Sequence, residues 1–494
     1  MALAKHILSK STFMYGCQCP KRLFLHKFKR EVRNPGDEQH QAILDAGTHV
    51  GELARQLFKH GVDASPPDHY SYHISVEKTK ALIQRDVPII YEAAFQYEGV
   101  LCAVDILVKQ GKRWYAFEVK STTSVKNQHI QDAALQYYVV RNCGLPLEDI
   151  SIIYLNREYV RKGELNIKQL FTTQSILAEV LELQDDVAIK INELKALLAQ
   201  REMPIVDIGP HCLAPYVCDF TDHCWAHIPK ENSVFELMRA PSWELYDAGY
   251  IHLDEIPLDY ELSSKVLKQL THYRSGAIYI DKESIREFLE PLTYPLYFFD
   301  FETIMPGIPE FDDSRPYQQI PFQFSLHVQQ KKESELAHFE FLGDGLNDPR
   351  PALIESMIDL LGSSGSIICY NMSFEKSRIN ELAQTYPEYE AALLSIHNRI
   401  VDLMIPFQKQ WYYHPAFKGS YSIKAVLPVL VPELTYSDLA IQEGGTASFV
   451  YSQLKYQKKE TVTVQREQLL AYCQLDTLAM VRILDYLKQM LQAE

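Results

Sequence analysis

The sequence lacks long apolar runs. No stretch of its 494 residues approaches the ~18 consecutive apolar residues of a membrane-spanning helix. Lys5 and Lys10 interrupt the opening MALAKHILSKS, so this stretch lacks the continuous apolar core of a signal peptide. Internal repeats and low-complexity tracts are missing as well. We therefore expect a cytoplasmic protein with no membrane partner.

An excess of positive charge is also lacking. The chain has 49 Lys and Arg against 64 Asp and Glu, which gives a net charge of −15. This balance excludes a protein that coats nucleic acid through its overall field, but it leaves room for local basic segments. Residues 21–33 form such a segment, which is either a phosphate-contacting surface or a solvated helix face.

The pattern of apolar residues predicts an α/β protein. Residues 1–229 contain three β-runs over 88–120, a helix near 128–142, a further β-run (ISIIYLN) and a long helix over 172–200. Residues 230–290 show no clear β pattern and are expected to form a helical connector. Strands and helices alternate again over 291–494, from TYPLYFFDFETI to a final helix at 465–491.

Two carboxylates and a lysine mark the β-runs of the first part. Asp105 precedes Glu118 across a turn, and strand periodicity places Glu118 and Lys120 on one face. Converging carboxylates can hold Mg²⁺ or Mn²⁺, and a nearby lysine can stabilise charge on a phosphate or help to deprotonate a water. His49, on a helix predicted over 38–58, is a further candidate ligand, and Gln136 can orient water or phosphate. The alternative is a surface hairpin with alternating charges.

The order of these five residues resembles the RecB-type PD-(D/E)XK nucleases. SKSTFMYGCQCPKRLFLH and GPHCLAPYVCDFTDHC resemble the iron–sulfur subgroup of that family, over residues 1–229. The resemblance implies a restriction-endonuclease-like fold, with His49, Asp105 and Glu118 as metal ligands and Lys120 and Gln136 as catalytic residues. The subgroup has a tyrosine four residues after the glutamine, where this chain has Val140. Either Tyr137 or Tyr138 replaces it, or its role is lost.

Cysteine is sparse and clustered. Cys212, Cys218 and Cys224 lie within 13 residues, and the fourth ligand of a metal site has to come from elsewhere. Cys19 is the preferred candidate because it stands in the CPKR segment, and Cys17 is the alternative. Spacings of five residues between cysteines favour a 4Fe-4S cluster over structural zinc. A set of unligated buried cysteines is the third alternative.

A dispersed acidic set marks the last part of the chain. Asp300 and Glu302 share one face of an aromatic strand, where carboxylates are costly unless they bind something. Glu375 follows at a strand–helix junction, and Tyr472 and Asp476 lie four residues apart on the final helix. Acidic groups from these three elements can surround two divalent ions for in-line phosphodiester hydrolysis, with Tyr472 orienting the water.

This order resembles the tyrosine variety of the DEDD exonucleases, which have a ribonuclease H-like fold, over residues 291–494. Glu375 departs from the usual aspartate. Together the two halves resemble a bacterial family in which a RecB-like iron–sulfur nuclease domain precedes a DEDD exonuclease domain. The resemblance implies a metal-dependent nuclease that degrades DNA from single-stranded ends at two sites. The alternatives are one active site with the other domain binding the strand, and a non-catalytic nucleic-acid-binding or assembly protein.

Overall fold

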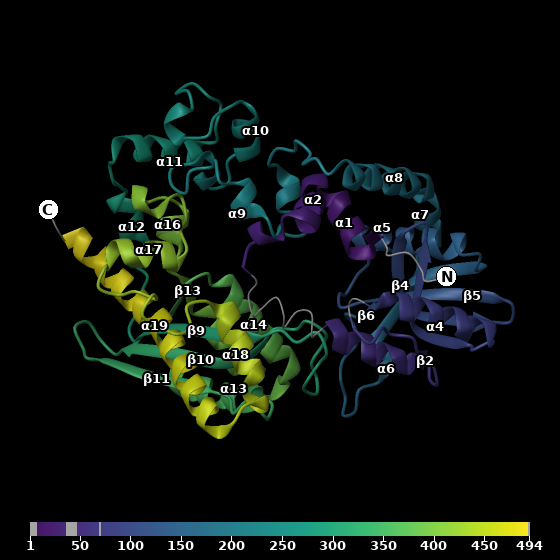
Figure 1. Cartoon of the computed structure of the whole chain (residues 1–494). Helices are drawn as coiled ribbons and strands as arrows, with labels where there is room; N and C mark the ends of the chain where they lie inside the picture. Colours follow the sequence, from purple (N-terminus) through teal and green to yellow (C-terminus); the bar gives the residue numbers. More distant parts are fainter. Residues whose placement is uncertain (1–6, 36–46, 69–70, 493–494) are drawn as a thin grey trace. The chain divides into compact units, whose positions relative to one another are not determined.

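The structure is a computed structural model that describes residues 7–35, 47–68 and 71–492. It is a mixed α/β protein with two compact units (Figure 1). The first unit comprises Met1–His227 and Gly307–Tyr317, and the second comprises Ile228–Pro306 and Gln318–Glu494. Among the helices of the described ranges, none has the length and apolar character needed to cross a membrane.

The first unit is built on a seven-stranded sheet. The strand order is β2-β3-β4-β5-β6-β7, and β1 pairs with β4. Strands β3, β4 and β5 are antiparallel neighbours, whereas β5 and β6 run parallel. The strands are β1 (Leu8–Ser9), β2 (Val62–Asp63), β3 (Ile89–Tyr97), β4 (Val100–Gln110), β5 (Arg113–Lys120), β6 (Leu147–Leu155) and β7 (Phe171–Ser175).

Helix α5 packs across β3, β4 and β6, and α7 and α8 pack on α5. The core between these layers includes Ala133, Val140 and Ile152, all fully buried. The helices are α1 (Lys10–Gln18), α2 (Pro20–Phe28), α4 (Tyr72–Gln84), α5 (Asn127–Asn142), α6 (Ile167–Leu170), α7 (Leu177–Glu182), α8 (Gln184–Gln200) and α9 (Thr221–Cys224).

The prediction of a long helix over 172–200 is wrong at the start of this range. Residues Phe171–Ser175 form β7, which pairs antiparallel with β6. Thr172 and Thr173 are β-branched and favour this extended conformation, and the edge of β6 supplies their partners. The helices α7 and α8 occupy the remainder of the predicted range.

Residues 230–290 belong to the second unit and are mainly helical. Helices α10 (Ser242–Asp247), α11 (Ser264–Ser275) and α12 (Lys282–Leu289) lie here, with the two-residue strand β8 (Tyr279–Ile280) pairing with β14 (Tyr412–Tyr413). Leu245, Leu253 and Val266 contribute to a separate buried cluster. The segment therefore has a small core of its own within the second unit.

The second unit contains a five-stranded mixed sheet in the order β11-β10-β9-β12-β13. Strand β10 pairs antiparallel with β9 and β11, whereas β12 runs parallel to β9 and β13. The strands are β9 (Leu296–Ile304), β10 (Ile320–Gln329), β11 (Leu336–Leu342), β12 (Ser366–Cys369) and β13 (Ile400–Asp402).

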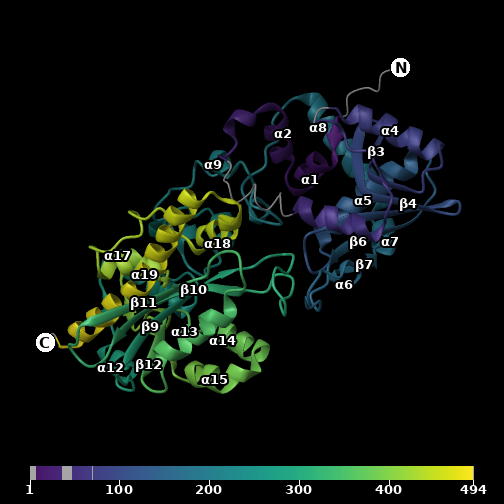
Figure 2. The same ribbon diagram turned by 90° about the horizontal axis from the view of Figure 1, so that it is seen from below.

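Alternation along β9 separates a hydrophobic face from an acidic one. Tyr297, Phe299 and Phe301 pack into the core with residues of α13 and α14. Asp300 and Glu302 point to the opposite face, which α18 and α19 cover (Figure 2). The helices of this unit after β10 are α13 (Arg350–Leu361), α14 (Ser373–Thr385), α15 (Glu390–Asn398), α16 (Ile405–Gln408), α17 (Ile423–Leu430), α18 (Gly444–Gln453) and α19 (Lys459–Gln492).

Short 3₁₀ helices connect these elements. They are Arg30–Val32, Arg55–Leu57, Pro210–Cys212, Val234–Glu236, Leu253–Glu255, Pro387–Tyr389, Pro415–Phe417 and Leu454–Tyr456.

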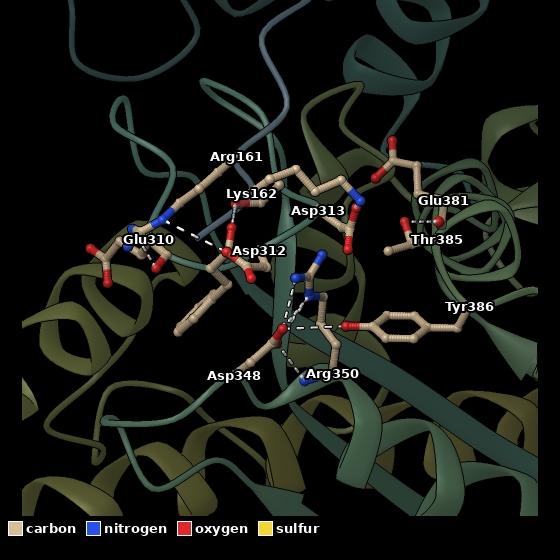
Figure 3. Close-up of polar contacts among 12 residues, drawn as sticks. Arg161, Lys162, Glu310, Asp312, Asp313, Asp348, Arg350, Glu381, Thr385 and Tyr386 are labelled. Carbon is tan, nitrogen blue, oxygen red and sulfur yellow. Dashed lines mark hydrogen bonds and ion pairs between the residues drawn. The ribbon is translucent and has the colours of Figure 1, made fainter. Parts of the chain in front are cut away.

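Gly307–Tyr317 follows β9 in the chain but belongs to the first unit. Arg161 donates hydrogen bonds to the carbonyls of Pro309 (2.9 Å) and Glu310 (2.8 Å), and Lys162 pairs with Asp313 (Figure 3). Tyr317 donates to the carbonyl of Ser121 at 2.5 Å. The chain therefore passes between the two units three times.

The second unit also contains a buried cation with its own partners. Arg350 is 1% exposed, and Asp348 accepts hydrogen bonds from its Nε and Nη2 (Figure 3). The Tyr386 hydroxyl donates to the same carboxylate at 3.3 Å. These bonds satisfy the arginine and fix the start of α13.

Phe299→Ala is expected to lower the free energy of unfolding of the second unit by about 3–5 kcal/mol, because it leaves a cavity between the sheet and its helices. Phe299 is fully buried and contacts the rings of Phe301 and Phe324. Denaturant unfolding followed by circular dichroism measures the loss. Phe339→Ala is the control, because this side chain on β11 is 41% exposed.

Candidate functional site

The first cluster lies where β4 and β5 pair. Asp105 comes from β4, and its Oδ2 accepts a hydrogen bond from the Val119 N–H at 2.7 Å. Glu118 is 2% exposed, and its Oε1 accepts from Lys120 Nζ at 2.7 Å. Phe117 and Val119 point to the other face, into a separate hydrophobic cluster. The hairpin thus brings Asp105, Glu118 and Lys120 together, and the two carboxyl groups are buried rather than displayed on a surface.

Gln136 holds the glutamate from the opposite side. It is fully buried on α5, and its amide donates to Glu118 Oε2 at 2.6 Å and to the Ala103 carbonyl at 2.9 Å. The side chain therefore fixes the Glu118 carboxylate. This contact is with the carboxylate itself rather than with a bound water or phosphate.

Sequence reasoning missed three charged residues of this cluster. Lys10 Nζ lies 2.7 Å from Glu118 Oε1, and Lys120 Nζ lies 2.6 Å from Asp132 Oδ2. Glu92, on β3, faces the same cavity. Lys10 lies outside the predicted motif, so only the fold shows that it is near Glu118. Asp132 precedes Gln136 by one helical turn, and only the fold shows that it contacts Lys120.

The lysines decide how the two carboxyl groups titrate. Burial and the charge of Glu118 raise the pKa of Asp105 to about 8. Burial opposes ionisation of Glu118 too, but Lys10 and Lys120 hold the pKa of this group well below its usual range. Glu118 is therefore the resident anion of the cluster, and Asp105 carries the proton near neutral pH.

Asp105, Glu118 and Lys120 line a cavity of about 670 Å³, together with Arg55, His129 and Tyr216. Among the described residues that line it, His49 does not appear; this side chain is exposed on the helical stretch 47–54. The first part of the helix predicted over 38–58 lies outside the described residues. The histidine predicted as a ligand is thus not directed into the cavity.

The helix that carries Gln136 supplies none of the tyrosines described at this cavity. Val140 is fully buried, and Tyr137 and Tyr138 pack in or against the hydrophobic core of the first unit. Of the described tyrosines, Tyr216 is the one that lines the cavity. Neither Tyr137 nor Tyr138 takes the place left by Val140.

The four predicted cysteines meet at one pocket. Cys19, Cys212, Cys218 and Cys224 line it together with Lys21 and Arg22. Arg22 donates to Asp219 at 2.6 Å, which ties α2 to the loop between the second and third cysteines of the late group. Residues almost 200 positions apart in the chain are thus held together.

The donor set of this pocket fits a metal cluster. Burial raises the pKa of Cys218 to about 11 and also raises the pKa values of Cys19 and Cys224, so these thiols ionise only with a cationic partner. In the described chain the cysteines form no group of three ligand atoms within 4.8 Å, the spacing that a single zinc ion requires. Cys17 packs against the core of the first unit instead.

The second cluster joins distant elements of the second unit. Asp300 and Glu302 come from β9, Glu375 from the first turn of α14, and Tyr472 and Asp476 from α19. Burial, followed by the charges of Asp476 and Glu375, raises the pKa of Asp300 well above its usual range. Asp476 accepts hydrogen bonds from Tyr472 and, at 2.6 Å, from the hydroxyl of Tyr436.

Burial is the largest influence on the electrostatics here, and the charges of neighbouring carboxylates add to it. Burial raises the pKa of Glu375 to about 8 and that of Asp476 to about 6. Burial and the charge of Asp476 raise the pKa values of Asp300 and Glu302 as well. A divalent cation would favour the ionised form of these carboxyl groups and offset the cost of burying them together.

Two further observations fit a divalent ion at this cluster. Ligand atoms of Asp300, Glu302 and Cys473 lie within 4.8 Å of one another. Within the described structure, Glu375 Oε2 is buried and accepts no hydrogen bond. A buried oxygen of this kind is costly unless a ligand occupies its lone pairs.

Sequence reasoning missed Cys473, Tyr436 and Lys424 at this cluster. Lys424 Nζ lies 5.5 Å from the ring centroids of both Tyr436 and Tyr472, so a cation faces the aromatic side of the site. Cys473 adjoins Tyr472, and helical geometry alone places it near Asp476. Tyr436 lies in an irregular segment whose position no periodicity predicts.

Comparison with known proteins gives a match without an assigned activity. Residues 297–422 match a family described as a domain of unknown function, DUF2779. This range includes Asp300, Glu302 and Glu375 and ends before α19.

The similar curated proteins are uncharacterized proteins of mollicutes. One from Ureaplasma parvum is 29% identical over 247 residues, which is 44% of this chain and 35% of the relative. One from Mycoplasma genitalium is 28% identical over 215 residues, which is 40% of this chain and 32% of the relative. The alignments cover about a third of the length of these relatives.

The acidic cluster predicts a pH-dependent response to divalent cations. Each carboxyl group with a raised folded pKa stabilises the metal-free fold below its unfolded pKa of about 4, and this stability is lost as pH rises through about 6 for Asp476 and about 8 for Glu375. Mn²⁺ at about 100 times its Kd should restore about 2.7 kcal/mol at pH 8 and far less at pH 5.

Thermal unfolding at both pH values, with and without Mn²⁺, measures this difference. Asp300→Asn should reduce the Mn²⁺-dependent rise in Tm, whereas Glu433→Gln, at an exposed position, should retain it. An equal response in all three proteins would contradict the prediction.

The cysteine pocket predicts an iron–sulfur chromophore. Anaerobically purified protein should contain about four iron atoms and four sulfides per chain, with broad visible absorbance. Cys19→Ser should lose iron and Cys17→Ser should retain it, because Cys19 and not Cys17 lines the pocket. A colourless protein that contains zinc would overturn this prediction.

Proposed function

We propose that this protein is a divalent-metal-dependent nuclease that degrades DNA, from single-stranded ends, at two sites. The convergence of Asp300, Glu302, Glu375 and Asp476 supports this proposal most strongly. These residues come from a strand, a strand–helix junction and a late helix, and burial raises the pKa of all four, with neighbouring carboxylates adding to the shift of Asp300, Glu302 and Glu375. Buried acidic groups in this arrangement are the usual ligands of Mg²⁺ and Mn²⁺ in phosphodiester hydrolysis.

The arrangement of elements supports the finer fold assignments that the resemblance implies. In the second unit, the mixed sheet carries the D-x-E strand at its centre and the final helix across one face. This agrees with a ribonuclease H-like DEDD domain. In the first unit, the β4–β5 hairpin with α5 behind it agrees with a restriction-endonuclease-like domain.

Residues of the second unit have separable roles in this proposal. Asp300, Glu302, Glu375 and Asp476 would hold the divalent ions, which supply the charge that activates water and stabilises the leaving oxygen. The Tyr472 hydroxyl, fixed by Asp476, is placed to orient a water beside the carboxylates. Lys424 supplies positive charge next to that tyrosine and favours the approach of a phosphate.

In the first unit, lysines neutralise the acidic site more fully than in the second unit. Asp105 and Glu118 would hold a divalent ion, while Lys120 lies beside Glu118 and can donate a hydrogen bond to a phosphate oxygen. Lys10 balances a further negative charge of the cluster. The cysteine pocket, which we propose holds a 4Fe-4S cluster, joins the N-terminal segment to residues 212–224 and thereby supports α1, which begins with Lys10.

One observation favours a second candidate function, in which only the second unit hydrolyses and the first unit binds the strand. Both oxygens of Glu118 already have partners, with Lys10 and Lys120 on Oε1 and Gln136 on Oε2. An incoming ion has to displace a lysine from this carboxylate. The Lys120 ammonium, by contrast, has three N–H groups and pairs with Glu118 and Asp132, so it can still donate one hydrogen bond to a phosphate.

The two candidate functions are separated by single-site variants. If both sites hydrolyse, Asp300→Ala and Glu118→Ala should each remove a different activity by at least about a hundredfold, since several kcal/mol of charge stabilisation is lost in each. A time course on end-labelled single- and double-stranded DNA and RNA with Mg²⁺ or Mn²⁺ measures this loss.

Exposed carboxylates serve as controls. Glu433→Gln in the second unit and Glu158→Gln in the first should digest DNA at the unmodified rate. A Glu118→Ala protein with full activity and weakened DNA binding would select the second candidate function. A double variant of Asp300 and Glu118 that digests as fast as the unmodified protein would exclude both.

A further inference from the structure

The loop between Cys212 and Cys218 displays an unusual set of side chains. Leu213, Tyr216 and Val217 are 47%, 58% and 66% exposed. Tyr216 is also one of the residues that line the 670 Å³ cavity with Asp105, Glu118 and Lys120. Tyr216 is therefore exposed to solvent and also borders the cavity that the charged cluster lines.

The backbone beneath this ring is fixed. Gln18, the last residue of α1, donates hydrogen bonds from Nε2 to the carbonyls of His211 and Tyr216, both at 2.7 Å. The N–H of Cys218 donates to the carbonyl of Cys212 at 2.8 Å, which closes the loop at its base. Hydrogen bonds therefore fix the backbone of the loop that carries Tyr216.

The chemistry of the cavity limits what such a ring can bind. The cavity volume falls in the range of about 300–1,000 Å³ that is usual for small-ligand sites, so a nucleotide fits. Lys120 lines this cavity and supplies charge for a phosphate. An exposed aromatic ring next to phosphate-binding groups is the arrangement by which proteins hold single-stranded nucleic acid.

We infer that Tyr216 is a substrate-positioning residue that stacks on an unpaired base at the end of a strand, next to the phosphate held at Lys120. This inference rests on the proposed function and specifies the substrate class of the first site. A base within a duplex is stacked on both faces and has none free for the tyrosine. The site therefore selects single-stranded ends, and stacking serves every base because each has an aromatic face.

Binding of a fluorescently labelled single-stranded oligothymidylate, in the presence of chelator, tests the inference on the full chain. Tyr216→Ala should weaken binding by about 5- to 150-fold, the factor expected for one lost base stack. Tyr216→Phe should bind as tightly as the unmodified protein, because the ring remains. Leu213→Ala is the matched control in the same loop and should also bind normally.

An oligonucleotide with an abasic terminal position separates stacking from a general effect. The unmodified protein should lose affinity for it by the same factor, and Tyr216→Ala should not distinguish the two oligonucleotides. Equal binding by Tyr216→Ala and the unmodified protein would overturn the inference, as would equal losses of Tyr216→Ala on both oligonucleotides.

The failure of the inference and the failure of the proposed function give different results. Cleavage assays in an Asp300→Ala background report the first site alone. If cleavage there is missing while the ring-dependent binding persists, Tyr216 positions a strand at a non-hydrolytic site and the two-site function is wrong. If cleavage depends on Glu118 but KM is unaffected by Tyr216→Ala, the function stands and the inference fails.

Discussion

The cost of burying several carboxyl groups close together is the constraint on which the second unit depends. A strand and two helices hold four carboxyl groups close together, those of Asp300, Glu302, Glu375 and Asp476. The packing of these elements does not depend on the carboxyl groups, because the opposite face of β9 supplies Phe299 and Phe301 to the hydrophobic core. Burial and the neighbouring carboxylates raise the pKa of Asp300 and Glu302, which favours the protonated form of this acidic face. A divalent cation offsets the same cost without a proton. The hydrophobic half of the sheet thus stabilises an acidic half that is suited to bind metal.

The first unit also buries a carboxylate, but positive charges stabilise it there. Its buried glutamate is neutralised by two lysines from different elements, Lys10 at the start of α1 and Lys120 on β5. The position of α1 in turn depends on the segment that follows it, where Cys19 shares a pocket with three cysteines from the far end of the unit. The integrity of this cysteine pocket and the charge balance at Glu118 are therefore linked through a short stretch of chain.

Local patterns predicted much of this structure. The strand that carries Asp300 and Glu302, the β4–β5 hairpin and the final helix follow from periodicity, because each alternates or repeats strongly enough to be recognised alone. The sequence predicts a helix from residue 172, but residues 171–175 form a strand, since pairing with the edge of β6 determines their conformation. Lys10, Glu92, Tyr216 and Tyr436 could not be predicted as site residues, because each reaches its cluster through a contact with a distant segment. For His49 the error is the opposite one. The sequence predicts this helical histidine as a metal ligand, but its side chain is exposed to solvent.

The central claim is that these distant carboxylates form cation sites. Anomalous diffraction from crystals of the full chain soaked in Mn²⁺ measures this most directly, because it locates the ion without reference to activity. The account predicts anomalous peaks among Asp300, Glu302 and Asp476, and a weaker peak beside Asp105 and Glu118, where Lys10 and Lys120 compete. Crystals with ordered carboxylates at both places and no manganese at either would contradict the account.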